Sequence, residues 1–188
     1  MKIAVAQLKS VSPYGQSNHY AVEKKEKESP GDYEKRTWRN RAHFDSKGNT
    51  FIPPMQFKNC LRDAAAYLSE RIKGKGMKTW SEKFRAGVLV TEPIPLGIHY
   101  EKMMGTWIFV PSDGKTGGGK RVDKCFPTFP SWEGVVNFYI LDDQITEDVF
   151  RSHLEQAGKF IGIGYFRPIR GGYWGRFEVV DLEWKDQT

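Results

Sequence analysis

The sequence predicts a single α+β domain, residues 1–188, with a ferredoxin-like βαββαβ core that two long insertions interrupt. Residues 2–9, 86–91, 134–141 and 173–184 have the apolar or β-branched patterns of strands. Residues 54–72 and the segment after Thr146 repeat apolar side chains at helical spacing. The segments 10–52 and 96–133 are too polar, or too rich in turn residues, to belong to the core.

The first strand alternates small and branched residues, so both of its faces are expected to be buried, as in a central strand. The first insertion, residues 10–52, holds a charged run from Glu23 to Arg41. This run is too polar for the core, and we expect a partly mobile segment that ends in a hairpin near Phe51.

The clearest helix spans residues 54–72, where Pro54 suits the first turn and Gly74 follows the end. The second strand, 86–91, stops at Pro93. The second insertion, 96–133, is expected to form a long basic hairpin with arms near residues 106–110 and 121–126 and a tip over residues 112–120. The strand 134–141, a helix from Thr146 to Gly158, a glycine-rich loop and the last strand complete the order.

Composition narrows the class of partner. The formal net charge is +6 and the pI is about 9.2, a balance that favours an anionic partner such as nucleic acid. No apolar stretch approaches the ~18 residues of a membrane span, so no membrane contact is expected. Cys60 and Cys125 have neither CxxC spacing nor a nearby His, which argues against a metal site. Two cysteines without a secretion signal predict the cytoplasm.

The strongest candidate for binding is the stretch from Gly162 to Phe177, which combines glycine, aromatic residues and arginine. Glycines allow backbone N–H groups to approach phosphates, aromatic rings stack on bases, and arginine binds phosphate. The candidate residues are Arg167, Arg170, Tyr173 and Arg176. For Trp174 and Phe177, a place in the core is favoured. The glycine spacing fits neither a Rossmann nor a Walker motif, so no cofactor is expected.

Two further basic clusters are candidates. The hairpin tip carries Lys115, Lys120, Arg121 and Lys124, which suit docking on a phosphate backbone or a neighbouring subunit, or simply form a solvated loop. Lys58 and Arg62 are four residues apart and therefore lie on one face of the first helix, which is either a binding face or a solvated one.

Catalytic patterns are poor, so we expect a protein that is not an enzyme. The four histidines are far apart in sequence and form no paired motif. Asp32, beside Gly31, could serve in metal-assisted RNA cleavage, but an aspartate in a loop is more often structural.

The segment Ile52-Pro53-Pro54-Met55-Gln56-Phe57-Lys58-Asn59-Cys60-Leu61-Arg62-Asp63-Ala64 resembles the one that opens the first helix of the RAMP superfamily, the RNA-binding proteins of CRISPR systems. Pro54 stands where that family has glycine, and the family's serine pair is absent. Residues 162–177 are similar to the family's glycine-rich loop. The insertions fall where backbone subunits of CRISPR surveillance complexes carry a finger (here 10–52) and a thumb (here 96–133).

This resemblance implies an RRM-like palm that binds guide RNA, a thumb wedged between bases, and subunits stacked side by side. Lys58 and Arg62 would lie on the RNA-facing helix, Arg167 and Arg170 in the glycine loop, and Lys120 and Arg121 on the thumb. The function implied is a non-catalytic subunit that binds RNA, or single-stranded nucleic acid, in a homo-oligomer or a CRISPR-type ribonucleoprotein. The alternatives are a phage-encoded subunit mimic that inhibits through protein contacts, and a metal-dependent endoribonuclease centred on Asp32.

Overall fold

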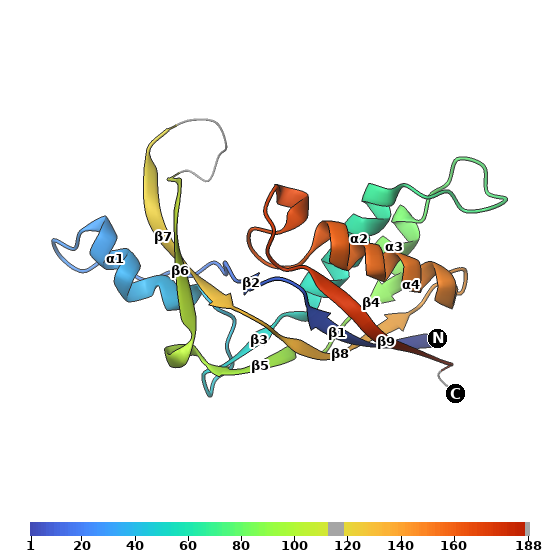
Figure 1. Cartoon of the computed structure of the whole chain (residues 1–188), viewed down its shortest axis with the longest axis horizontal. Coiled ribbons are helices and arrows are strands. Elements are labelled where there is room, and N and C mark those ends of the chain that lie inside the picture. Colours follow the sequence, from blue (N-terminus) through green and yellow to red (C-terminus); the bar gives the residue numbers. More distant parts are fainter. Residues whose placement is uncertain (113–118, 187–188) are drawn as a thin grey trace.

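The computed structural model describes residues 1–112 and 119–186. The expected hairpin tip lies largely outside the described residues, and Lys115 with it. The strands are β1 (Lys2–Ser10), β2 (Tyr14–Gly15), β3 (Asn49–Ile52), β4 (Val88–Leu89), β5 (Ile94–His99), β6 (Met104–Pro111), β7 (Arg121–Phe129), β8 (Glu133–Ile140) and β9 (Phe177–Asp186). The helices are α1 (Pro30–Thr37), α2 (Pro54–Leu68), α3 (Ser81–Gly87) and α4 (Glu147–Gln156) (Figure 1).

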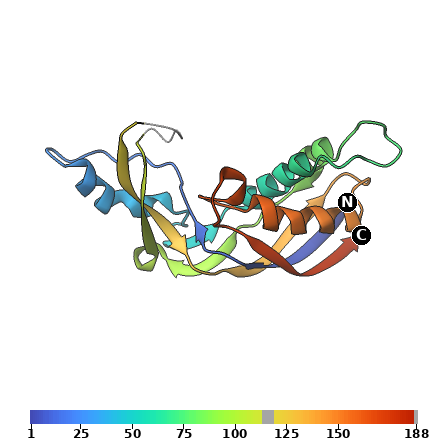
Figure 2. The same cartoon turned by 45° about the horizontal axis from the view of Figure 1, so that its top comes forward.

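The main sheet has the strand order β4-β8-β1-β9 with antiparallel pairing, so the α+β class predicted from the sequence is confirmed. The first strand is central: Ala6 lies opposite Val136 on one side and Leu182 on the other. Helices α2, α3 and α4 all cover the same face of the sheet (Figure 2). Ala4 is buried while Val5 is only half-buried. The expectation that both faces of β1 are buried is therefore wrong, because only one face is covered by helices.

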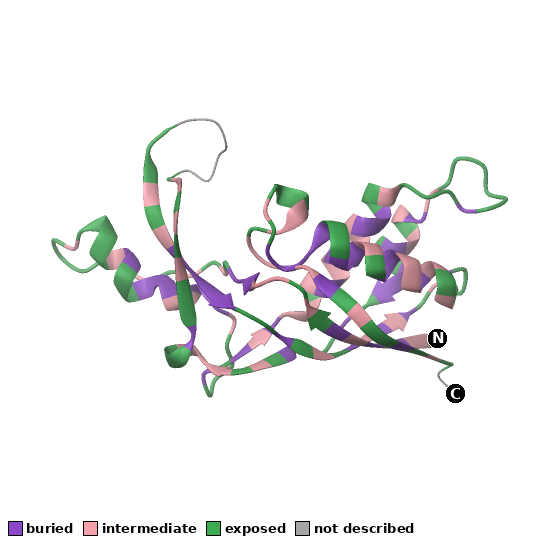
Figure 3. Ribbon diagram, in the orientation of Figure 1, coloured by how far each residue is buried: buried purple, intermediate pink, exposed green. Residues whose placement is uncertain are grey.

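The core lies between this sheet and the helices (Figure 3). The buried stripe of α2 consists of Phe57, Cys60, Leu61, Ala64 and Ala65, as the helical spacing predicts. Burying one large apolar side chain contributes about 1.5–3 kcal/mol to the free energy of folding. The burial of this stripe is therefore the main interaction that holds α2 on the sheet. The helix ends at Leu68, earlier than predicted, because Ser69 takes a left-handed conformation and its N–H bonds to the carbonyl of Ala65.

The predicted second strand, 86–91, is reduced to the two residues of β4 because α3 occupies the residues before it. Trp80 and Phe84 are buried one helical turn apart, and the ring of Phe84 stacks on Phe150 and His153. This packing overrides the β propensity of the local sequence. Likewise, α4 does not stop at Gly158 but continues through a π-helical turn, Ala157–Ile161, and ends at Gly162, where φ is +70°.

The charged run of the first insertion forms α1 and a 3-10 turn, Trp38–Arg41. The prediction that this run stays outside the core is wrong for Glu34 and Arg41, which are buried and form a two-point ion pair. The same two side chains bind both backbone groups of Cys125 in β7: its N–H donates to Glu34 Oε1 (2.8 Å), and its carbonyl accepts from Arg41 Nη1 (3.0 Å). The charges are thus satisfied by each other and by the hairpin.

The predicted hairpin arms pair with each other. In β6 and β7, Thr106 lies opposite Phe126 and Val110 opposite Val122. These strands form a three-stranded sheet with β2 in the order β2-β7-β6. The sequence did not predict the pairing of β5 with β3, which joins the hairpin region to the first insertion. The base of the hairpin and the 3-10 turn extend the core beyond the main sheet, because Trp38 and Cys125 are buried in the same cluster as the residues under the helices (Figure 3).

Within the described residues, no helix is both long and apolar enough to cross a membrane.

Removing the buried partner of Arg41 should destabilise the fold strongly. Glu34→Ala leaves a buried guanidinium without its carboxylate, and the expected loss is about 3–5 kcal/mol in the free energy of unfolding. Glu183→Ala, which breaks the Glu183–Lys185 pair (2.5 Å) on β9, where both side chains are exposed, is the control and should change stability little. Urea denaturation of both variants is the measurement. Equal effects would contradict the role given to the buried pair.

Candidate nucleic-acid interface

A polar cleft of about 310 Å³ opens where α2, the glycine-rich loop and the segment after β2 meet. Helix α2 contributes Gln56, Asn59 and Arg62, which follow one another at three-residue steps and so share one face. The other lining residues are Ser17, His43, Gly164, Tyr165 and Arg167. The cleft therefore brings together two basic segments that are far apart in sequence, α2 with Arg62 and the glycine-rich loop with Arg167.

Two predicted arginines meet in this cleft at a single carboxylate. Arg62 donates from Nη2 (2.6 Å) and Nε (2.9 Å) to Asp63 Oδ1, and Arg167 Nη2 lies 3.4 Å from Asp63 Oδ2. The side chain of Arg62 is 41% exposed and that of Arg167 is 19% exposed. One carboxylate cannot neutralise two guanidiniums, so the cluster keeps a positive charge. Partial burial reduces solvent screening of that charge and strengthens its attraction for an anion.

The glycine-rich loop packs closely on the chain near its start. Tyr165 N–H donates to the carbonyl of Gly15 (2.8 Å), and Gly175 N–H donates to that of Pro13 (2.7 Å). A Cβ on Gly164, where φ is +76°, would lie 2.3 Å from the Gly15 oxygen. These close approaches explain why glycine is needed at this position.

The prediction that backbone N–H groups of this loop approach phosphates is wrong for four of them. The N–H groups of Ile163, Tyr165, Trp174 and Gly175 all bond to backbone carbonyls inside the protein, so they are not available to a phosphate. These four groups cannot bind an anion, which leaves the guanidinium groups of Arg62 and Arg167 as the strongest anion ligands that line the cleft. The preferred interpretation of Trp174 and Phe177 as core residues is confirmed, because both are buried.

Tyr165 connects the loop to the base of the hairpin. Its ring stacks on Phe126 of β7 with centroids 3.9 Å apart and planes 11° apart. Burial raises the pKa of the Tyr165 phenol, which therefore stays protonated at neutral pH and can donate a hydrogen bond into the cleft.

Three predicted residues lie near the cleft but do not line it. Lys58 is half-buried on α2, four residues before Arg62. Arg170 and Tyr173 are exposed on the same glycine-rich loop as Arg167, and the Tyr173 ring packs edge-on against Phe166.

The remaining three predicted residues lie elsewhere. Lys120 and Arg121 are exposed at the far end of the hairpin, where Arg121 Nη2 donates to the carbonyl of Phe109 (2.7 Å) and its guanidinium lies over the Phe109 ring. Arg176 lines a different hollow, of about 320 Å³, and its Nε donates to the carbonyl of Lys159. The structure does not bring these residues together with Arg62 and Arg167.

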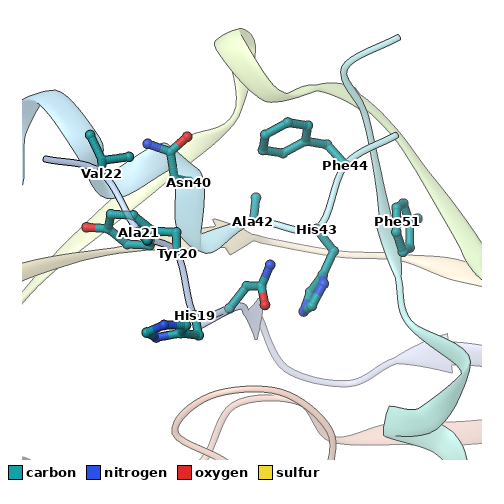
Figure 4. A pocket seen from close by; sticks show the side chains of 10 residues that line it. His19, Tyr20, Ala21, Val22, Asn40, Ala42, His43, Phe44 and Phe51 are labelled. Carbon is teal, nitrogen blue, oxygen red and sulfur yellow. The ribbon is translucent and has the colours of Figure 1, made fainter. Parts of the chain in front are cut away.

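Sequence reasoning missed several residues of this region. His43 lines both the cleft and an adjoining hollow of about 280 Å³, in which Tyr20 and Asn40 lie on one side and Phe44 and Phe51 on the other (Figure 4). Burial lowers the pKa of His43, so its ring is neutral at pH 7. A lone histidine in a polar segment gives no pattern that would have identified it.

The hairpin presents a second feature that the sequence analysis did not single out. Trp107 and Phe109, which alternate along β6 and so share a face, are 48% and 55% exposed. Large aromatic side chains left open to solvent on one face are typical of a surface that binds a partner. The alternation Trp107-Ile108-Phe109 was the available signal.

Among the described residues, no group of three or more His, Cys, Asp or Glu side chains is arranged to hold a metal ion. Asp32 takes part in the first turn of α1: its N–H donates to Ser29 Oγ (3.1 Å), and its carboxylate accepts from the same hydroxyl (2.7 Å). This is a helix-capping arrangement, which favours the structural interpretation of Asp32.

A matched pair of glycine variants should distinguish the contribution of close packing to the stability of the loop from that of backbone strain. Both Gly171 and Gly175 have positive φ, but a Cβ at Gly171 meets nothing within 4 Å, whereas one at Gly175 would lie 1.8 Å from the Ile163 oxygen. Gly171→Ala should therefore cost only the ~1–2 kcal/mol of the left-handed conformation. Gly175→Ala should cost clearly more in urea denaturation. Similar losses would show that the loop does not need its close packing.

No model of a known protein family matches this sequence, and no curated protein matches it. Among solved structures, the chain is similar to the crystal structure of Cmr6 from Pyrococcus furiosus. The TM-score is 0.50 and the sequence identity is 16%. The similarity covers 95% of this chain and 99% of the Cmr6 chain. The chain therefore has an α+β fold similar to that of Cmr6.

Proposed function

We propose that this protein is a non-catalytic subunit that binds single-stranded RNA within a CRISPR-type ribonucleoprotein, in which copies lie side by side along the strand. In this proposal the four-stranded sheet with α2 and α4 is a ferredoxin-like, RRM-like palm. Residues 10–52 act as its finger and residues 96–133 as its thumb.

The observation that carries the proposal is the pairing of Arg62 with Arg167 across the cleft. The two residues come from α2 and from the glycine-rich loop, yet their guanidinium groups share one carboxylate. Arginine presents five N–H donors in a planar fork that matches phosphate oxygens. The excess positive charge of this cluster suits the backbone of a nucleic acid.

Two further observations support the proposal. The chain carries a formal net charge of +6, which favours a polyanionic partner over a neutral one. Its fold is similar over nearly the whole chain to that of Cmr6. This similarity is the basis for proposing a role in an RNA-binding CRISPR complex. The arginines of the cleft are the groups through which this chain would bind the RNA.

The proposal assigns binding rather than catalysis to this subunit. The residue that the sequence offered for metal-assisted cleavage, Asp32, is engaged in capping α1 by way of Ser29. The charged side chains that line the cleft are the two arginines, which can only donate hydrogen bonds, and this suits holding a strand rather than activating a water molecule.

Charge reversal in the cleft should abolish strand binding selectively. Arg62→Glu with Arg167→Glu places negative charge against the phosphates, and at least a tenfold loss of affinity, about 1.4 kcal/mol, is expected. The control is Lys73→Glu with Lys75→Glu, which makes the same change in net charge at exposed sites in the loop after α2.

Fluorescence anisotropy with a labelled oligo-uridine strand, repeated over a range of salt concentrations, is the measurement. The wild-type affinity should fall steeply with salt. If the wild-type protein does not bind the strand, or if both double variants bind equally, the proposed function is wrong.

The exposed aromatic face of β6 is the proposed contact between neighbouring copies. Trp107→Ser with Phe109→Ser should leave strand binding by a single copy intact and prevent assembly of several copies on one strand, because the apolar surface is lost. Tyr67→Ser, which removes an exposed aromatic ring from α2, is the control. Size-exclusion chromatography with multi-angle light scattering, with and without the strand, gives the number of copies; unchanged assembly in the double variant would contradict this contact.

A further inference from the structure

A chain of hydrogen bonds beneath the cleft has a direction that the backbone determines. It begins at Gln16, which is fully buried. The side-chain Oε1 of Gln16 accepts from the backbone N–H of His43 (2.7 Å), and its Nε2 donates to the backbone carbonyl of Phe51 (2.8 Å). A backbone N–H can only donate and a carbonyl can only accept, so the orientation of the Gln16 amide has no alternative.

The second hydrogen of Gln16 Nε2 is donated to the hydroxyl of Tyr14 (3.1 Å). Tyr14 is also fully buried, and burial raises the pKa of its phenol, which therefore stays protonated. The hydrogen of this fully buried hydroxyl needs an acceptor, and since Gln16 Nε2 is a donor, the remaining partner among the described residues is Gln56, whose Oε1 accepts it (2.9 Å). The direction of every hydrogen bond from His43 to Gln56 is thereby set.

This arrangement decides which end of the Gln56 amide faces the cleft. Oε1 is held by Tyr14, so the Nε2 group must point to the other side, and Gln56 lines the cleft beside Arg62 and Arg167. The described residues provide no acceptor for Gln56 Nε2 within hydrogen-bond distance. The cleft thus presents a neutral donor of fixed orientation next to two cationic ones.

We propose that this cleft binds one phosphodiester group of the strand, with Gln56 Nε2 donating to a phosphate oxygen and Tyr14 and Gln16 acting as positioning residues for that amide. The inference rests on the proposed function and adds a site within it. A phosphodiester offers only acceptor oxygens and a negative charge, which is the complement of the donors at Gln56, Arg62 and Arg167. The strand, rather than free phosphate, is the expected source of the phosphodiester group, because the proposed function assigns this cleft to strand binding.

The first test exchanges the donor for an acceptor without disturbing the buried chain of hydrogen bonds. In Gln56→Glu, one carboxylate oxygen can still accept from Tyr14, while the other replaces Nε2 and faces the phosphate. At least a tenfold loss of affinity for the oligo-uridine strand is expected, about 1.4 kcal/mol. Gln144→Glu makes the same change of charge in the exposed loop before α4, where it lines a different hollow, and should have little effect.

The same variants are then tested on a strand whose linkages are methylphosphonates, which lack the negative charge. If Gln56 faces a phosphodiester, the penalty of Gln56→Glu relative to Gln144→Glu should shrink markedly on this strand. If the penalty persists at full size, Gln56 contacts a base or sugar, and the phosphodiester assignment is wrong. If the two variants bind the normal strand equally well while the wild type binds it, the inference fails and the proposed function stands. A wild type that does not bind overturns both.

The positioning role of Tyr14 is tested by a double-mutant cycle. Tyr14→Phe keeps the ring in the core but releases Gln56 Oε1, so the amide is free to turn. Gln56→Leu should weaken strand binding several-fold in the wild-type background and hardly at all in the Tyr14→Phe background. Circular dichroism and thermal melting establish that each variant is folded. Equal losses in the two backgrounds would show that Tyr14 supports the fold only and does not orient Gln56.

Discussion

The buried ion pair between Glu34 and Arg41 is the interaction on which the hairpin half of the molecule depends. Two hydrogen bonds join the two charges to each other, and two more join them to the backbone N–H and carbonyl of Cys125 in the middle of β7. A buried charge without a partner is costly, so the pair and the strand must come together in one geometry. The polar first insertion is thereby made part of a core.

The candidate site depends indirectly on this ion pair, because the pair holds β7, and β7 contacts the glycine-rich loop. With β7 held in place, Phe126 offers its face to Tyr165, and Phe129 stacks against Tyr14. The glycine-rich loop then reaches the start of the chain through the Tyr165–Gly15 hydrogen bond, which brings Arg167 next to α2. The cleft is therefore assembled from three segments far apart in sequence, none of which could form it alone.

Helix α2 and strands β1 and β8 could be predicted because their residues carry the period of a helix or a strand. Helix α3 could not be predicted, since it depends on burying Phe84 against residues of α4. Arg62 and Arg167 were recognisable as candidates by residue type and neighbourhood, but their meeting at Asp63 is a product of the fold. Gln56 could not be predicted as a site residue from the sequence, because its role depends on the buried side chains that orient its amide.

The central position of β1 has a consequence for the way the chain folds during synthesis. Lys2 is paired with Ile140 on one side and with Asp186 on the other, so β1 receives β8 and then β9 as neighbours only after the residues between them have been synthesised. At about 5–20 residues per second, that delay is roughly 10–40 s. Both edges of β1 stay without a partner until β8 has been made, and one edge stays open until β9 follows, so wrong strand pairing is a hazard for the nascent chain during this interval.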